Sequence, residues 1–225
     1  LIEEFIPYLE QTFNLIPDPR ARLVNGHSSG GWSSLWLQTT YPDFFGGVWS
    51  TSPDPVDFRD FQVIDVYAPG ENMYVDRKGE RRPIARMGGK PVLFYDAFCK
   101  VEEVMGPGGQ LGSFEAVFSP KGADGKPVRL WDRETGAIDA DVAKLWEPYD
   151  IRLNLERNWE TLGPKLAGKL HVITGSADTF YLEGAVEKLK ASLEALGSDA
   201  VVEIIPGKDH SDILDRALAE RIDRE

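Results

Sequence analysis

A serine set among glycines near the start of the chain is the first residue that could carry out chemistry. It stands in residues 23–32, LVNGHSSGGW, within the motif Gly26-x-Ser28-x-Gly30. A short apolar run precedes the motif and helical spacing follows it, which predicts a strand, a sharp turn and a helix. Such a turn strains the backbone at the serine, and glycines let the strand and the helix approach closely. We expect the turn to raise the Ser28 hydroxyl as a nucleophile, and a Gly/Ser-rich surface loop is the alternative.

A serine hydroxyl needs a base beside it, and the chain has only three histidines. His27 lies inside the turn, and we expect its side chain to point away from Ser28 and to pack. His171 opens an apolar run and is expected to be a strand-end residue. His210 lies in a polar loop after the expected strand at 200–205, near the end of the chain. A histidine in that position predicts the base, so we assign the role to His210.

The base in turn needs an acidic partner that orients its ring. Asp178 follows the expected strand at 169–174, and turn residues release it at the carboxyl end of that strand. Asp54 and Asp57 follow an earlier strand and stay open as alternatives. With Asp178 the order along the chain is serine, aspartate, histidine, which is the order of α/β-hydrolases and of neither chymotrypsin-like nor subtilisin-like proteases. The N–H of Ser29, the residue after the nucleophile, is the expected oxyanion-hole donor.

The elements that must position these residues alternate between helices and short apolar strands. We expect helices over 2–14, 30–40, 151–161, 181–196 and 211–223, and strands over 21–25, 46–50, 169–174 and 200–205. Helices that alternate with short apolar strands predict an α/β fold with a mostly parallel sheet and helices on both faces. The length of 225 residues suits one domain.

A long stretch over about 53–150 interrupts this alternation and is predicted to be an irregular insertion within the domain. Hairpin tips are expected at 76–79 and 123–126, and a flexible break at 106–109. We expect the insertion to lie over the site as a cap. Four aromatic residues are candidates for lining an acyl or aryl pocket, and the alternative is that they form the insertion's own small core: Trp131, Trp146, Tyr149 and Phe180.

The composition narrows the classes of partner. Lys and Arg number 25 against 37 Asp and Glu, giving a net charge of −12 and no basic patch, which argues against nucleic acid and anionic membranes. Cys99 is the single cysteine, so no intramolecular disulfide forms, and no Cys/His cluster or Gly-rich phosphate loop predicts a metal or cofactor. No apolar run reaches membrane-spanning length. The expected partner is a small-molecule ester, and the compartment is left open.

With these residues in place the chain resembles the putative-esterase family of the α/β-hydrolase superfamily, which includes esterase D, feruloyl-esterase-like and enterochelin-esterase-like proteins. The resemblance rests on Gly26-His-Ser-Ser-Gly-Gly31, Tyr41-Pro-Asp-Phe-Phe45, Gly175-Ser-Ala-Asp-Thr-Phe-Tyr181 and the loop that ends in His210. It implies a serine carboxylic-ester hydrolase that acts through an acyl-enzyme intermediate and needs no cofactor. Three alternatives stay open: an acyltransferase, a peptidase, or a binding protein that keeps the fold without catalysis.

The resemblance also implies that the chain corresponds to the C-terminal part of such a domain. The family's sheet has further strands before the serine turn, and a loop after one of them supplies the second oxyanion donor. We therefore expect the strand at 21–25 to form an exposed edge, and the 225 residues by themselves to have poor activity.

Overall fold

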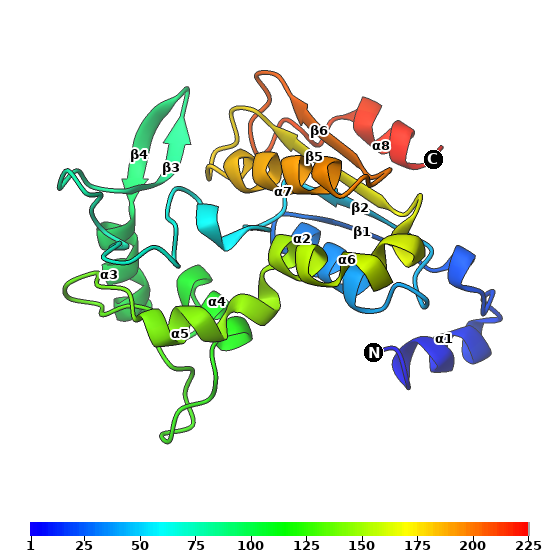
Figure 1. Cartoon of the computed structure of the whole chain (residues 1–225), viewed down its shortest axis with the longest axis horizontal. Helices are drawn as coiled ribbons and strands as arrows, with labels where there is room; N and C mark the ends of the chain where they lie inside the picture. Colours follow the sequence, from blue (N-terminus) through cyan, green and yellow to red (C-terminus); the bar gives the residue numbers. More distant parts are fainter. Residues whose placement is uncertain (225) are drawn as a thin grey trace.

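Four short apolar segments form the parallel sheet of the fold, as expected from the alternating pattern. The computed structural model describes residues 1–224 (Figure 1). In sheet order the strands are β1 (Leu23–His27), β2 (Gly47–Thr51), β5 (Leu170–Gly175) and β6 (Val201–Ile205), all parallel. Strand β2 is buried along its whole length, whereas β1 at the edge is partly exposed. The carboxyl ends of these strands meet at one edge of the sheet, and Ser28, Asp178 and His210 lie in the loops that follow β1, β5 and β6 there.

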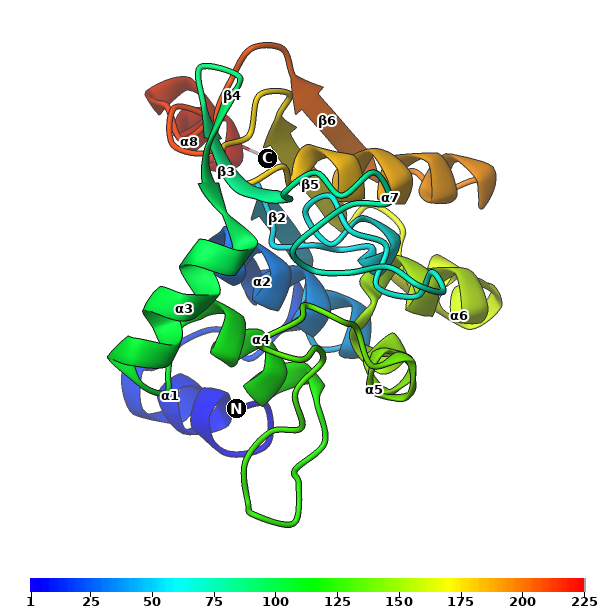
Figure 2. The same ribbon diagram turned by 90° about the vertical axis from the view of Figure 1, so that its left-hand side faces the viewer.

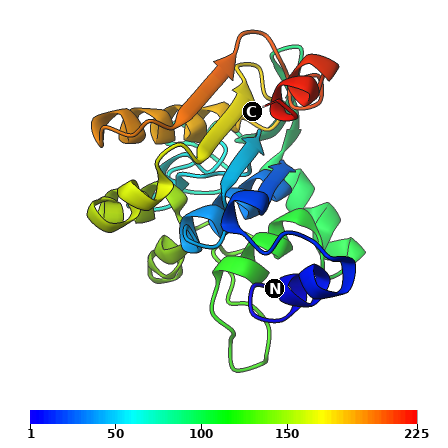
Figure 3. The ribbon, with the colours of Figure 1, turned by 90° about the vertical axis from the view of Figure 1, so that its right-hand side faces the viewer.

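Helices cover both faces of the sheet, which confirms the predicted α/β class (Figure 3). One face carries α2 (Ser29–Thr40), α6 (Ile151–Leu166) and α7 (Glu183–Ala195), and the other carries α8 (Arg216–Ile222). The predicted apolar stripe of α7 is buried at Val186, Leu189 and Leu193. Helix α1 (Phe5–Phe13) lies beside the amino end of the sheet, away from the other helices in Figure 1.

Helix α8 is shorter than the predicted segment over 211–223. It begins only after Asp215, whose side chain accepts a hydrogen bond from the backbone N–H of Leu218 at 2.9 Å. An aspartate in this N-cap position satisfies one of the unpaired donors of the first turn, so it starts a helix. Residues 211–215 therefore extend the loop that carries His210.

The insertion is more regular than predicted. It contains a hairpin of β3 (Pro83–Met87) and β4 (Lys90–Phe94), the helices α3 (Tyr95–Met105), α4 (Gln110–Phe118) and α5 (Ala140–Leu145), and short 3-10 turns at Phe58–Asp60 and Glu147–Tyr149. A further 3-10 turn, Pro19–Ala21, precedes β1. The break at 106–109 joins α3 to α4, and turns close at 76–79 and 122–126 as expected. The prediction of an irregular stretch was wrong because α4 buries Leu111, Phe114 and Phe118 at helical spacing, a signal that nearby glycines and proline obscured.

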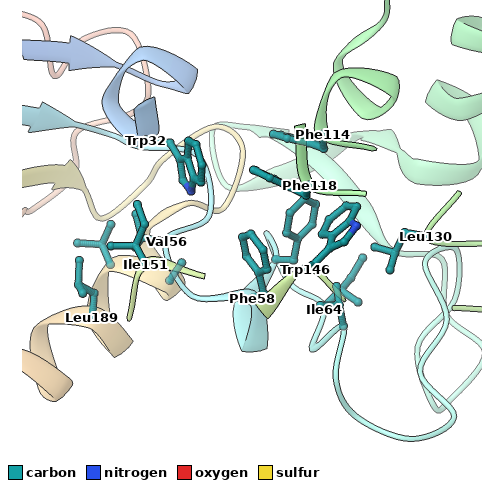
Figure 4. Close-up of a cluster of buried hydrophobic side chains, with 14 of the residues drawn as sticks. Trp32, Val56, Phe58, Ile64, Phe114, Phe118, Leu130, Trp146, Ile151 and Leu189 are labelled. Atoms are coloured by element: carbon teal, nitrogen blue, oxygen red, sulfur yellow. The ribbon is translucent and has the colours of Figure 1, made fainter. Parts of the chain in front are cut away.

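One hydrophobic cluster joins the insertion to the helices of the sheet. Figure 4 shows it running from Ile151 and Leu189 through Phe58 to Trp146 and Leu130. The aromatic rings of Phe58 and Trp146 meet edge to face with centroids 5.8 Å apart. The insertion thus packs on the sheet-bearing part through apolar side chains.

A buried ionic network ties the two ends of the insertion together. The Arg152 guanidinium at the start of α6 lies 3.0 Å from the Asp57 carboxylate, which is fully buried. Asp150 accepts a hydrogen bond from the N–H of Phe58 at 3.0 Å and caps α6 through the N–H of Leu153. Because these contacts join segments more than 90 residues apart in sequence, they fix where the insertion leaves and rejoins the fold.

Candidate active site

Ser28 occupies the strained turn between β1 and α2 that the motif predicts. Its φ of 59° and ψ of −125° lie outside the regions that side-chain-bearing residues prefer. The turn is held by its own backbone, because the N–H of Ser28 donates to the Thr51 carbonyl and its carbonyl accepts from Trp32, both at 3.0 Å. A conformation of this kind is kept at a cost of about 1–3 kcal/mol only where the surroundings enforce it, so the strain points to a functional residue.

The glycines of the motif do not share the same role. A Cβ on Gly26 would stand 2.1 Å from the carbonyl oxygen of Gly30, and one on Gly31 would stand 2.9 Å from the carbonyl oxygen of Thr51. A Cβ on Gly30 would meet nothing within 4 Å. The close approach that the turn needs therefore depends on Gly26 and Gly31, and the expectation that Gly30 shares this role with Gly26 was wrong.

Asp178 and His210 form a buried pair at the carboxyl ends of β5 and β6. The Asp178 carboxylate accepts a hydrogen bond from Nδ1 of His210 at 2.8 Å, and the two residues are 0% and 7% exposed. The other Asp178 oxygen accepts from the N–H of Phe180 at 2.8 Å. With Nδ1 protonated toward the carboxylate, Nε2 of His210 is left as the acceptor.

The loops that carry this pair are joined by their backbones. The N–H of Ala177 donates to the carbonyl of Lys208 at 3.0 Å, and the N–H of Ser176 donates to the carbonyl of Ile205 at 2.9 Å. Gly175 allows this contact, because a Cβ there would lie 2.1 Å from the Lys208 carbonyl oxygen. The loops that carry Asp178 and His210 thus form one unit.

His27 connects this unit to the serine turn. Its Nε2 lies 2.8 Å from the carbonyl oxygen of His210, and the two rings lie 4.4 Å apart. Since His27 directly precedes Ser28, these contacts bring the serine turn and the base loop together. Burial lowers the pKa of His27, so the neutral form is favoured, with Nε2–H as the donor. The expected packing role fits, and His171 lies in β5 stacked on Trp49 with centroids 4.7 Å apart.

Ser29 begins α2, so its N–H has no partner within the helix and lies where the helix dipole is positive. Its hydroxyl donates to the Asp54 carboxylate at 2.5 Å. Burial raises the pKa of Asp54, and the hydrogen bond from Ser29 opposes this rise. The Gln110 side chain, at the start of α4, lies 3.4 Å from the Ser29 hydroxyl. No local sequence pattern predicts this contact.

Asp54 and Asp57, the alternative acids considered from the sequence, have partners other than His210. Asp54 accepts from Ser29, and Asp57 is paired with Arg59 at 2.7 Å and with Arg152. Among the three carboxylates considered from the sequence, Asp178 is the one hydrogen-bonded to His210.

The four aromatic pocket candidates separate into different environments. Trp131 and Trp146 are 1% and 0% exposed and belong to the hydrophobic core, so neither side chain is accessible to a substrate in this structure. Tyr149 is half-buried against Phe118. Phe180 is 36% exposed, and its ring meets that of His210 edge to face with centroids 4.9 Å apart. Trp131 and Trp146 are therefore core residues, as in the alternative interpretation, and of the four candidates Phe180 is the one in ring contact with His210.

Within residues 1–224, no group of three or more His, Cys, Asp or Glu side chains is arranged to hold a metal ion. Cys99 is buried and unpaired by disulfide. Over the same residues, no helix combines the length and the apolar character needed to cross a bilayer.

Comparison with known sequences places this chain in a family. A family profile described as "Putative esterase" matches residues 1–187, which include the serine turn and Asp178, while His210 lies beyond the matched range. The chain belongs to this family. No match to the sequence is found among curated proteins.

Comparison with solved structures finds similarity at low sequence identity. A ferulic acid esterase is 13% identical, with a TM-score of 0.53 over 98% of this chain and 56% of its own. The monoacylglycerol lipase of Paleococcus ferrophilus is 14% identical, with a TM-score of 0.40 over 97% of this chain and 69% of its own. The chain thus spans little more than half the length of the ferulic acid esterase, and its fold is that of the α/β-hydrolases.

Proposed function

We propose that this protein is a serine carboxylic-ester hydrolase that works through an acyl-enzyme intermediate. The observation that carries the proposal is the buried Asp178–His210 hydrogen bond of 2.8 Å at the sheet edge where the strained Ser28 turn ends. Membership of an esterase family supports it. Small-molecule esters are the proposed substrates.

In the acylation step His210 takes the proton of the Ser28 hydroxyl through Nε2 as the serine oxygen attacks the ester carbonyl. A new C–O bond forms, and the carbonyl oxygen takes up the negative charge. The N–H of Ser29 at the start of α2 donates to that oxyanion, aided by the positive end of the helix dipole. When the tetrahedral intermediate collapses, His210 gives its proton to the leaving alcohol.

Deacylation repeats these steps with water. His210 accepts a proton from the water that attacks the acyl carbon, and it then returns the proton to Ser28 as the acid departs. Asp178 keeps Nδ1 protonated and stabilises the imidazolium that forms twice in each cycle. Phe180 supplies the exposed apolar surface next to the base, and we assign it to substrate contact.

The test uses p-nitrophenyl esters and a fluorophosphonate probe with two variants. Ser28→Ala is expected to lose hydrolysis by on the order of a thousandfold or more and to abolish labelling, because the nucleophile is gone. Phe180→Ala is expected to raise KM for aryl esters while kcat changes little, because an apolar contact is lost without disturbing the triad.

Ser33→Ala is the matched control, since its exposed hydroxyl only donates to the Ser29 carbonyl on α2. It should keep full labelling. Unchanged activity in Ser28→Ala would show another nucleophile, and absence of labelling in the unaltered protein would favour a binding protein with this fold. Transfer to an added alcohol, or cleavage of a peptide anilide, would point instead to an acyltransferase or a peptidase.

A further inference from the structure

We propose that Arg86 is a positioning residue that braces the loop carrying Asp178, so that the insertion takes part in catalysis. The proposal rests on the proposed function, because it gives Arg86 its role through the acid of the triad. Arg86 lies in β3, in the hairpin that stands beside the ends of β5 and β6 in Figure 2.

Arg86 holds the acid loop by its backbone and its side chain. Its N–H donates to the Thr179 carbonyl at 2.8 Å. Its Nε donates to the carbonyl of Asp178 itself at 2.9 Å, and a terminal nitrogen lies 3.5 Å from the carbonyl of Ser176. One residue of the insertion therefore bonds to three carbonyl oxygens within four residues of the acid loop.

The same guanidinium also fixes the far end of the loop. It pairs with Glu183, the first residue of α7, at 2.5 Å, and both side chains are 17% exposed. It lies 4.6 Å from the centroid of the Tyr181 ring, whose residue has a positive φ of 60°. The planar guanidinium of arginine can donate to several oxygens while it stacks on a ring. The ammonium group of lysine can donate hydrogen bonds but does not stack in this way.

A second contact from the insertion supports this assignment. The side-chain amide of Gln62 donates to the Phe180 carbonyl at 3.2 Å, and Tyr95 donates in turn to Gln62. Among residues 1–224, the carboxylate of Asp178 accepts hydrogen bonds from the N–H of Phe180 in its own loop and from His210. Its orientation therefore depends on the loop backbone, which the insertion holds in place.

The first arm of the test is a double-mutant cycle on ester hydrolysis. Arg86→Ala is expected to lower kcat by about ten- to a hundredfold with KM changed less than about threefold, because a small displacement of a catalytic group is costly. Arg86→Lys should recover part of the loss. In an Asp178→Asn background the Arg86→Ala change should have little further effect, because both act through the same carboxylate.

Arg81→Ala is the matched control. Arg81 precedes the same hairpin and also makes an ion pair, with Asp96, and a ring contact, with Phe94, but these partners lie within the insertion. Its loss should leave kcat within about twofold and leave the cycle with Asp178→Asn additive.

The second arm measures amide exchange over residues 176–183 and does not depend on activity. Exchange there should be faster in Arg86→Ala than in the unaltered protein or in Arg81→Ala. Unchanged exchange, or equal loss of kcat in both Asp178 backgrounds, would overturn the brace. Absence of fluorophosphonate labelling at Ser28 in the unaltered protein would overturn the esterase proposal. The exchange measurement would then decide by itself whether Arg86 holds the loop that carries Asp178.

Discussion

At the scale of single residues, His27 shows how one side chain links the strained Ser28 turn to the loop that carries His210. The His27 ring packs against the His210 ring, and its Nε2–H donates a hydrogen bond to the His210 carbonyl. His27 takes no proton in the proposed reaction. Because burial lowers its pKa from the ordinary 6.5, the folded protein resists its protonation. Because His27 is buried, we expect its contribution to the stability of the folded protein to depend on pH.

The sign of this effect follows from proton uptake. As pH falls below about 6.5, the unfolded chain protonates His27 before the folded protein does, so stability is lost as pH falls. His27→Gln keeps an N–H donor and removes the titrating group. We expect its urea midpoint to fall less between pH 7 and pH 5 than that of the unaltered protein. An equal fall in the urea midpoint of the two proteins would show that His27 does not contribute to the pH dependence of stability.

The choice among acidic residues also belongs to this scale. The sequence placed Asp54, Asp57 and Asp178 after strands, and each position suited an acid. The partners differ only in the folded protein, where Asp54 accepts from Ser29, Asp57 faces Arg152, and Asp178 faces His210. Loops that are distant in sequence bring these partners, so no local pattern could rank the three.

At the scale of elements, the strand–turn–helix around Ser28 was predictable because its signals are local. A short apolar run, closely packed glycines and helical spacing all lie within about a dozen residues. The structure adds that the glycines differ, since Gly26 meets backbone and Gly30 meets open space.

This difference gives a paired prediction. Gly26→Ala should destabilise the protein by roughly 1–3 kcal/mol or more, because a methyl group would overlap the Gly30 carbonyl that the turn cannot easily move. Gly30→Ala, inside α2, should be neutral or stabilise by roughly 0.5–1 kcal/mol through helix propensity. Thermal unfolding of both variants provides the measurement, and equal effects would contradict the assignment.

The elements of the insertion were harder to predict. Helix α4 carries a helical repeat of buried side chains, but α3 buries only Tyr95 and Cys99 and follows directly from β4. The turn Gly88-Gly89, with φ of 55° and 76°, closes the β3–β4 hairpin, which was not among the predicted hairpins. Elements this short are stabilised mainly by tertiary packing, so their own sequences signal them weakly.

At the scale of the whole molecule, the insertion is fastened to the sheet-bearing part by a shared core and a buried ionic network. The Arg152 side chain is 4% exposed and faces Asp57, Asp150 and Glu156. Removal of the Arg152 charge takes the cation from the buried Asp150 and leaves the buried Asp57 paired with Arg59, whose side chain is 42% exposed, so the buried carboxylates are less well compensated.

We therefore expect Arg152→Ala to destabilise the protein by roughly 3–5 kcal/mol. Arg157→Ala, on the same helix, removes a pair with Glu147 in which the arginine is 53% exposed, and should cost less than about 1 kcal/mol. Urea unfolding at pH 7 measures both. Similar midpoints for the two variants would show that the network does not fasten the insertion.

The sequence by itself determined the alternation of strands and helices, the strained serine turn and the placement of an aspartate and a histidine after strands. These features arise from hydrophobic periodicity and backbone sterics, which act between near neighbours in the chain. Only the tertiary structure decided that Asp178 meets His210, that Trp131 and Trp146 are buried, and that Arg86 reaches the acid loop. Such contacts join residues distant in sequence, and they exist only once the chain has closed on itself and excluded water between them.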